Sequence, residues 1–126
     1  MKLAILKDEK TLSRKSINNI YKTGQKLRSK SLTIIWINSK PQSSKIKLVI
    51  SVPKKNIKKA VDRNYLKRII RESYKTNKPF INDLIQDPIK IIIIYNKTTL
   101  IEFNKLEIEL LTLFEIIYKK QDAINQ

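Results

Sequence analysis

The sequence contains no cysteine and no histidine, and Gly24 is its single glycine. Without cysteine there are no disulfides and no thiol chemistry, which is typical of proteins of a reducing compartment. Without histidine as well, the common zinc sites, Ser-His and Cys-His nucleophile pairs and imidazole acid–base catalysis are excluded. One glycine is too few for a glycine-rich phosphate-binding loop. We therefore expect any chemistry that involves this chain to be carried by a partner or a metal ion.

Long apolar runs are also missing. The longest, "PIKIIIIY" at residues 88–95, is far shorter than the roughly 20 residues that span a bilayer. The stretch "LAIL" at residues 3–6 is too short for the apolar core of a secretory signal, and the charged "KDEK" follows it. We expect a soluble, cytoplasmic protein that does not enter a membrane.

Among the residues that are present, lysine and arginine far outnumber the acidic residues. The 126 residues include 27 Lys and Arg against 11 Asp and Glu, a formal net charge of +16. Because such self-repulsion opposes compaction, it favours a polyanionic partner, with nucleic acid first and an anionic membrane surface second. Hydrophobic residues make up 41% of the chain, enough for one modest core. We expect one domain over residues 1–126, with short flexible ends at 1–7 and 120–126.

The hydrophobic periodicity predicts six secondary-structure elements. In chain order they are a helix at 11–22, strands at 31–38 and 45–52 joined as an antiparallel hairpin, a helix at 57–75, a central strand at 89–95 and a terminal helix from Phe103 to about Tyr118. Gly24 ends the first helix, and Asn56 is expected to cap the second. This order predicts an α+β sandwich, with about three helices packed on a small mixed sheet.

The helix at 57–75 is expected to have two unlike faces. A helical wheel puts Val61, Tyr65, Leu66, Ile69 and Ile70 on one half, and Arg63, Asn64, Lys67, Arg68, Arg71 and Lys75 on the other. Like charges stacked at i, i+4 cost a few tenths of a kcal/mol per pair, so this cationic half is unusual for a solvated face. The preceding lysines Lys54, Lys55, Lys58 and Lys59 extend it. Arginine and lysine in this density predict phosphate contacts, and a plain solvent-exposed face is the open alternative.

The stretch "SVPKKNIKKAVDRNYLKRIIRES" at residues 51–73 resembles the signature of the protein subunit of bacterial ribonuclease P. The matching positions are Lys54, Lys55, Ala60, Arg63, Asn64, Lys67, Arg68, Arg71 and Glu72. "INNIYKTG" resembles the family's first helix, and "KIIIIYNK" its late central strand, so that roughly residues 5 to 120 fit in order. Three departures from the pattern occur: Tyr65 replaces an arginine, Val49 a frequent glycine, and the pair Tyr95-Asn96 a frequent Ala-Arg.

The resemblance implies a ribosomal protein S5 domain 2-like fold with a left-handed βαβ crossover. It further implies the protein subunit of an endoribonuclease that cuts the 5′ leader from precursor transfer RNA and leaves a 5′ phosphate on the mature end. In that enzyme the catalyst is RNA, which binds most of the Mg²⁺, so the protein is expected to supply neither catalytic nor metal-binding residues. The subunit would lower the magnesium requirement and broaden substrate use, with one protein per catalytic RNA.

The resemblance also implies two binding surfaces. The catalytic RNA would contact Lys54, Lys55, Lys58, Lys59, Arg63, Asn64, Lys67, Arg68 and Arg71. The single-stranded leader would lie in a cleft between the first helix and the sheet, at Ile17, Tyr21 and Ile35, with Trp36 or Tyr95 as nearby stacking surfaces.

Alternatives stay open for the site and for the function. Ile17, Tyr21 and Trp36 could instead belong to the core. Composition supports a non-catalytic, ribosomal-type RNA-binding protein almost as well. A DNA-binding protein that places the helix at 57–75 in a major groove is the weakest alternative, because Asn64 is its main candidate for reading bases.

Overall fold

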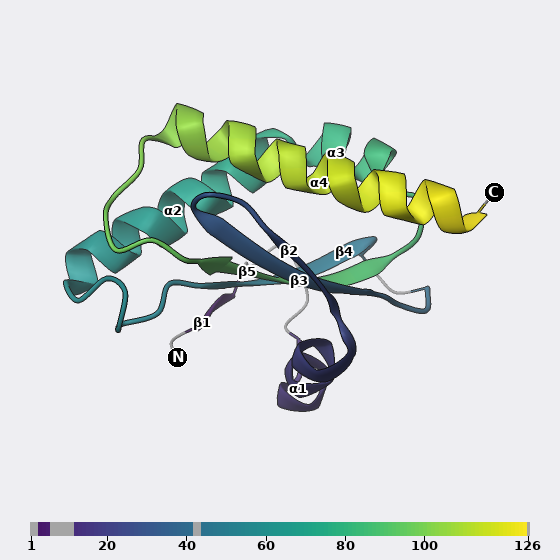
Figure 1. Ribbon diagram of the computed structural model, residues 1–126, viewed down its shortest axis with the longest axis horizontal. Helices are drawn as coiled ribbons and strands as arrows, with labels where there is room; N and C mark the ends of the chain where they lie inside the picture. Colours follow the sequence, from purple (N-terminus) through teal and green to yellow (C-terminus); the bar gives the residue numbers. More distant parts are fainter. Residues whose placement is uncertain (1–2, 6–11, 42–43, 126) are drawn as a thin grey trace.

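The computed structural model describes residues 3–5, 12–41 and 44–125 (Figure 1). Its elements are β1 (Leu3–Ile5), α1 (Arg14–Thr23), β2 (Gln25–Arg28), β3 (Leu32–Asn38), β4 (Ile46–Ser51), α2 (Ala60–Thr76), α3 (Lys78–Leu84), β5 (Ile89–Tyr95) and α4 (Phe103–Asn125). The α+β class is confirmed, and the sequence pattern missed β1, β2 and the short α3. Most of the end expected to be flexible at 1–7 lies outside the described residues. Residues 120–125, the other such end, continue α4.

The described strands form one mixed sheet in the order β1-β4-β5-β3-β2. β5 is central, as predicted, and it pairs parallel with β4 and antiparallel with β3. The predicted hairpin between β3 and β4 is therefore wrong, because β5 lies between them. Strand periodicity identifies strands but not neighbours, and a strand of continuous isoleucines buries more surface between two partners than at an edge. The parallel β4–β5 pair has α2 and α3 in its crossover, and the hand of this crossover stays a prediction.

Helices cover the two faces of the sheet unequally. Figure 1 shows α2, α3 and α4 together on one face and α1 alone on the other. Odd-numbered β5 residues such as Ile91 and Ile93 join the larger core under α2 and α4, whereas Ile92 packs with Ile20 of α1 and Ile35 of β3. Alternation of side chains along the strand thus places one isoleucine set in each layer. Since α1 is only ten residues long, it leaves part of its face of the sheet open.

Helix α2 differs in two ways from the prediction. It begins at Ala60 instead of Ile57, and Asn56 does not cap it: the Asn56 side-chain amide donates to the Tyr95 carbonyl at 3.2 Å. The buried face of α2 also differs from the one that the helical wheel predicted. Val61, predicted on the core side, is 71% exposed, whereas Arg63 and Lys67, predicted on the cationic side, are each only 7% exposed. The reason for Arg63 is local: its guanidinium turns back to the backbone carbonyls of Ile57 and Lys58, just before the helix, and its long stem is buried on the way.

Candidate nucleic-acid interface

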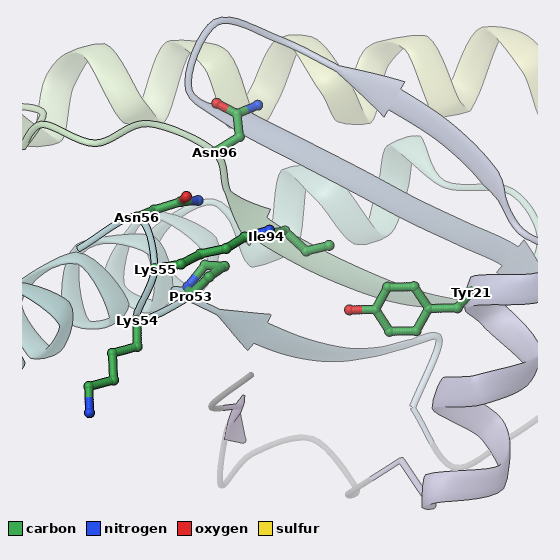
Figure 2. A pocket seen from close by; sticks show the side chains of 7 residues that line it. All are labelled: Tyr21, Pro53, Lys54, Lys55, Asn56, Ile94 and Asn96. Atoms are coloured by element: carbon green, nitrogen blue, oxygen red, sulfur yellow. The ribbon is translucent and has the colours of Figure 1, made fainter. Parts of the chain in front are cut away.

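A cleft of about 940 Å³ opens on the α1 face of the sheet (Figure 2). It is lined by Tyr21 of α1, by Pro53, Lys54, Lys55 and Asn56 of the β4–α2 turn, and by Ile94 and Asn96 at the end of β5. Segments far apart in the chain meet here because β4 and β5 are parallel neighbours that end at the same edge. The cleft combines an aromatic ring, an apolar floor, two lysines and two amides.

Helix α1 fixes the position of Tyr21. The helix starts at Ser13, whose hydroxyl accepts a hydrogen bond from the Ser16 amide at 3.1 Å. Ile20 is fully buried against the sheet, so the next residue, Tyr21, is turned to the side and is 39% exposed. Figure 2 shows its ring directed from α1 across the cleft. Partial burial raises the pKa of the Tyr21 hydroxyl above 10.0, so the ring stays neutral at physiological pH.

Gly24 allows α1 to lie this close to the sheet. A Cβ at this position would lie 2.5 Å from the Ile20 carbonyl oxygen and 2.8 Å from Cγ2 of Ile35. Only a residue without a side chain fits such an approach, although the backbone conformation itself is ordinary (φ −70°, ψ 154°). The sequence signal was therefore correct about where the helix stops, and the structure adds the steric reason.

The opposite wall is a hydrogen-bonded turn. The backbone amides of Asn56 and Ile57 donate to the Pro53 carbonyl at 3.0 and 3.1 Å, which closes the turn that carries Lys54 and Lys55. Both lysines are exposed. The Asn56 side chain ties the turn to β5, as described above. The lysine ammonium groups are thus presented on a fixed backbone at the rim of the cleft.

Asn96 closes the end of the cleft next to β3. Its backbone amide donates to the Ser31 carbonyl at 2.9 Å, and its side-chain amide donates to Thr33 Oγ1 at 3.1 Å and to the Ser29 carbonyl at 3.4 Å. Since these bonds use the amide nitrogens, the side-chain oxygen of Asn96 is available as an acceptor.

Of the residues expected to bind the leader, only Tyr21 lines the cleft. Ile17 is half-buried and packs with Ile35, which is buried under α1. Trp36 and Tyr95 belong to the larger core, so neither can offer a face to a base. The Tyr95 hydroxyl donates to the Thr99 carbonyl. Burial raises the pKa of Tyr95 to about 12, with smaller contributions from Glu109 and Tyr65. The alternative interpretation as core is therefore correct for Trp36, whereas Ile17 is only half-buried and Tyr21 lines the cleft.

The cationic residues predicted on α2 divide into two groups. Lys58, Lys59, Asn64 and Arg68 are exposed, as are Lys54 and Lys55 in the turn, and Arg71 is half-buried. Arg63 is buried, and its Nη1 donates to the carbonyls of Ile57 at 2.9 Å and Lys58 at 2.7 Å. Lys67 is buried one turn further on. Arg63 therefore positions the segment before α2, and the exposed group forms the cationic surface.

The sequence analysis missed Pro53, Asn56, Ile94 and Asn96 as lining residues. Ile94 could have been found from strand alternation, because it has the parity of Ile92 and faces α1. Asn96 was noted only as a departure from a family pattern, and Asn56 was interpreted as a helix cap. Among the described residues, no group of three or more Asp or Glu side chains could hold a metal ion. No described helix is long and apolar enough to span a membrane.

A strongly cationic α+β domain whose cleft combines a tyrosine, an apolar floor and lysines has the composition of a single-stranded nucleic-acid-binding domain. The family model described as Ribonuclease P matches residues 6–118. The chain therefore belongs to the ribonuclease P protein family, which confirms the resemblance seen in the sequence.

Individual relatives agree with this membership. The ribonuclease P protein component of Porphyromonas gingivalis is 32% identical over 82 residues, which cover 64% of this chain and 60% of the relative. That of Vibrio campbellii is 36% identical over 74 residues, covering 59% and 61%. The matched part thus spans about 60% of the length of these curated relatives.

Solved structures extend the likeness to the whole fold. The ribonuclease P protein of Thermotoga maritima superimposes with a TM-score of 0.71 at 26% identity, covering 86% of this chain and 97% of the other. The Staphylococcus aureus ribonuclease P protein gives a TM-score of 0.69 at 27% identity, covering 84% and 92%. The predicted fold family is thereby confirmed.

Proposed function

We propose that this chain is the protein subunit of the ribonucleoprotein endonuclease that removes the 5′ leader from precursor transfer RNA. Family membership supports the class of enzyme. The observation that carries the proposal is the cleft that Tyr21 lines together with Lys54 and Lys55, close in the chain to the exposed cations Lys58 and Lys59. This neighbourhood supports a site for single-stranded RNA next to a surface for phosphates. The catalytic RNA and the precursor are the proposed partners, with one protein per RNA.

The proposed chemistry belongs to the RNA. The described residues offer no carboxylate cluster for Mg²⁺, and the chain has no His or Cys. The catalytic RNA would therefore hold the metal ions, which when bound supply activated water and charge neutralisation at the scissile phosphate. The protein's own contribution is binding and orientation, which reduces the entropy that the reaction must otherwise lose. Because the protein's cations would neutralise phosphates, we expect the protein to lower the magnesium requirement.

The leader is proposed to lie in the cleft. A base stacked on Tyr21 gains ~1–3 kcal/mol, and this gain depends little on sequence because every base has a π-face. Ile94 provides an apolar floor beneath it, while Lys54 and Lys55 contact phosphates. Of the earlier leader set, Ile17 of α1 and Ile35 of β3 act behind the surface, since they pack together between α1 and the sheet.

The catalytic RNA is proposed to contact the cationic surface of α2. Lys58, Lys59 and Arg68 are exposed and reach phosphates directly, and Asn64 lies among them. Arg63 and Lys67, which the resemblance assigned to direct RNA contact, are buried in the free protein. We assign Arg63 an indirect role, because it holds the carbonyls of Ile57 and Lys58 beside the lysine-bearing turn.

Reconstitution with the cognate catalytic RNA tests the proposal. Cleavage of a precursor transfer RNA is measured across a magnesium series, with and without the protein. The protein is expected to shift the magnesium requirement downward and to tighten precursor binding. Absence of both effects would refute the proposed function. Co-purification with ribosomal particles in place of the catalytic RNA would instead favour a ribosomal-type RNA-binding protein.

A further inference from the structure

A second hollow, of about 620 Å³, lies on the exposed side of α2. We call it the Tyr65 pocket. It is lined by Leu100, which precedes α4, and by six residues of α2: Val61, Asp62, Asn64, Tyr65, Arg68 and Arg71. Its volume is within the roughly 300–1,000 Å³ that is typical of small-ligand pockets.

Apolar side chains form one wall of the Tyr65 pocket. Val61 is 71% exposed and Leu100 is 50% exposed, although both are aliphatic. They come from different segments, and both line the hollow beside the Tyr65 ring. The Tyr65 hydroxyl donates to the carbonyl of Ile101 at 3.1 Å, which fixes the ring and ties the Leu100 segment to α2. The wall is therefore an arranged apolar surface open to solvent.

Two arginines form the other wall. The Arg68 guanidinium lies over the Tyr65 ring, with Cζ 5.6 Å from the ring centroid, which is a cation–π contact. Arg71 also lines the pocket, and its buried Nε has no hydrogen-bond acceptor among the residues that the structure describes. The wall thus offers two guanidinium groups, one of which lies against an aromatic ring.

A third hollow, which we call the connecting hollow, shares lining residues with both the Tyr65 pocket and the cleft of Tyr21. It is about 410 Å³, shares Lys55 and Asn56 with the cleft, and shares Asp62 and Leu100 with the Tyr65 pocket. Lys58 and Lys59 line it as well. Lysines therefore line the hollow that shares walls with both sites, which favours a polyanionic occupant over an apolar peptide.

We propose that the Tyr65 pocket binds one unpaired nucleobase of an RNA partner. The base lies against Val61 and Leu100 and stacks on the Arg68 plane, and its flanking phosphates meet Arg71 and the lysines of the connecting hollow. The inference deepens the proposed function, since it assumes that the partner is RNA and adds how one nucleotide is held. The surface of α2 then recognises an unpaired base as well as backbone charge.

The test compares two single-stranded probes that differ only in their bases. One is a deca-adenylate RNA and the other is a decamer of abasic spacers, and fluorescence anisotropy gives the affinity of each for the full chain. All proteins carry Tyr21→Ala, which removes the cleft's contribution to base binding. The test variant adds Val61→Ser and Leu100→Ser. The control adds Ile108→Ser and Ile124→Ser, which remove two similarly exposed aliphatic side chains from α4.

The test variant is expected to lose about fivefold or more in affinity for deca-adenylate, as for the loss of one stacked base, with unchanged affinity for the spacer decamer. The control is expected to match the Tyr21→Ala parent on both probes. An equal change in affinity for both probes, or no change for either, would contradict the proposal that the Tyr65 pocket binds a base. Reconstitution with the catalytic RNA separates the two proposals. If the chain supports cleavage but the test variant still prefers deca-adenylate as strongly as its parent, only the proposed pocket is wrong. If the test variant loses base-dependent binding as expected but the chain has no effect on cleavage by the catalytic RNA, only the proposed function is wrong.

Discussion

The Arg63 guanidinium donates a hydrogen bond to the carbonyl of Ile57 at 2.9 Å, six residues earlier in the chain. The same nitrogen reaches the Lys58 carbonyl at 2.7 Å. These two carbonyls lie just before α2, where no side-chain cap satisfies the helix start. The first arginine of the basic motif thus organises the link between the cleft turn and α2, and its neighbours provide the exposed charge.

Replacing Arg63 with Gln should destabilise the fold. Two charge-assisted hydrogen bonds are lost and two carbonyls lose their donor, so the free energy of unfolding should fall by about 1–3 kcal/mol. Urea unfolding followed by circular dichroism measures this. The matched control is Arg68→Gln, which removes an exposed guanidinium and should change stability by less than about 0.5 kcal/mol. Equal stability of the two variants would contradict the assigned role of Arg63.

Charge reversal at Arg68 should affect RNA binding and leave the fold intact. Arg68→Glu is expected to weaken binding to the catalytic RNA several-fold. If one phosphate contact is lost, the slope of log affinity against log salt should become shallower by about 1. Filter binding across a salt series gives both quantities. Lys119→Glu on the exposed side of α4 is the control for net charge, and an equal effect there would mean that only total charge matters.

Tyr21→Ala should weaken binding of precursor transfer RNA more than binding of mature transfer RNA. The ring is the one aromatic side chain lining the described cleft, and loss of one stacked base costs ~1–3 kcal/mol. Tyr21→Phe keeps the ring and should retain most of the affinity. Affinities are measured in complex with the catalytic RNA. A loss that is the same for precursor and mature substrates would remove Tyr21 from the leader site.

Gly24→Ala should disturb the packing of α1. The new Cβ meets the carbonyl oxygen of Ile20 at 2.5 Å, and a backbone atom inside a helix cannot move away cheaply. We expect a loss of about 1–3 kcal/mol, as for overpacked core positions. Thermal unfolding measures the loss, with the exposed neighbour Gln25→Ala as a control that should be close to neutral. A stable Gly24→Ala protein would mean that α1 can shift away from the sheet.

Glu109 should contribute stability that depends on pH. Burial alone would raise its pKa, but hydrogen bonds from Ser29 and Ser31 and the charge of Lys97 outweigh burial and lower it below 4.5. The Ser29 hydroxyl and the Ser31 amide reach its Oε1 at 2.6 and 2.8 Å. Because the folded-state pKa is the lower one, this stability is present above about pH 4.5 and is lost as the pH falls through the folded value.

Glu109→Gln should therefore lower the unfolding temperature at pH 7, and the difference from the unchanged chain should shrink toward pH 3. Glu115→Gln on the exposed side of the same helix is the control, with little expected change at either pH. A difference that stays constant between pH 7 and pH 3 would show that the Glu109 carboxylate charge is not involved.

The sequence predicts the individual helices and strands of this fold better than it predicts which strands pair. The isoleucine run at 89–95 indicated a central strand, and Gly24 indicated a helix end, because both signals are local. The pairing of β4 with β5 depends on contacts across about 40 residues, and no local pattern encodes it. Arg63 was misplaced for a related reason: a wheel counts angles, whereas the direction of a long side chain depends on carbonyls that the wheel does not contain.

Binding of precursor transfer RNA with and without its 5′ leader tests the central claim most directly. The affinity of the catalytic RNA for each substrate is measured with and without this protein across a salt series. The proposed function predicts that the protein tightens binding when the leader is present and has little effect when it is absent. Equal tightening of both substrates with a steep salt dependence would contradict it, and would make the chain a general cationic RNA binder.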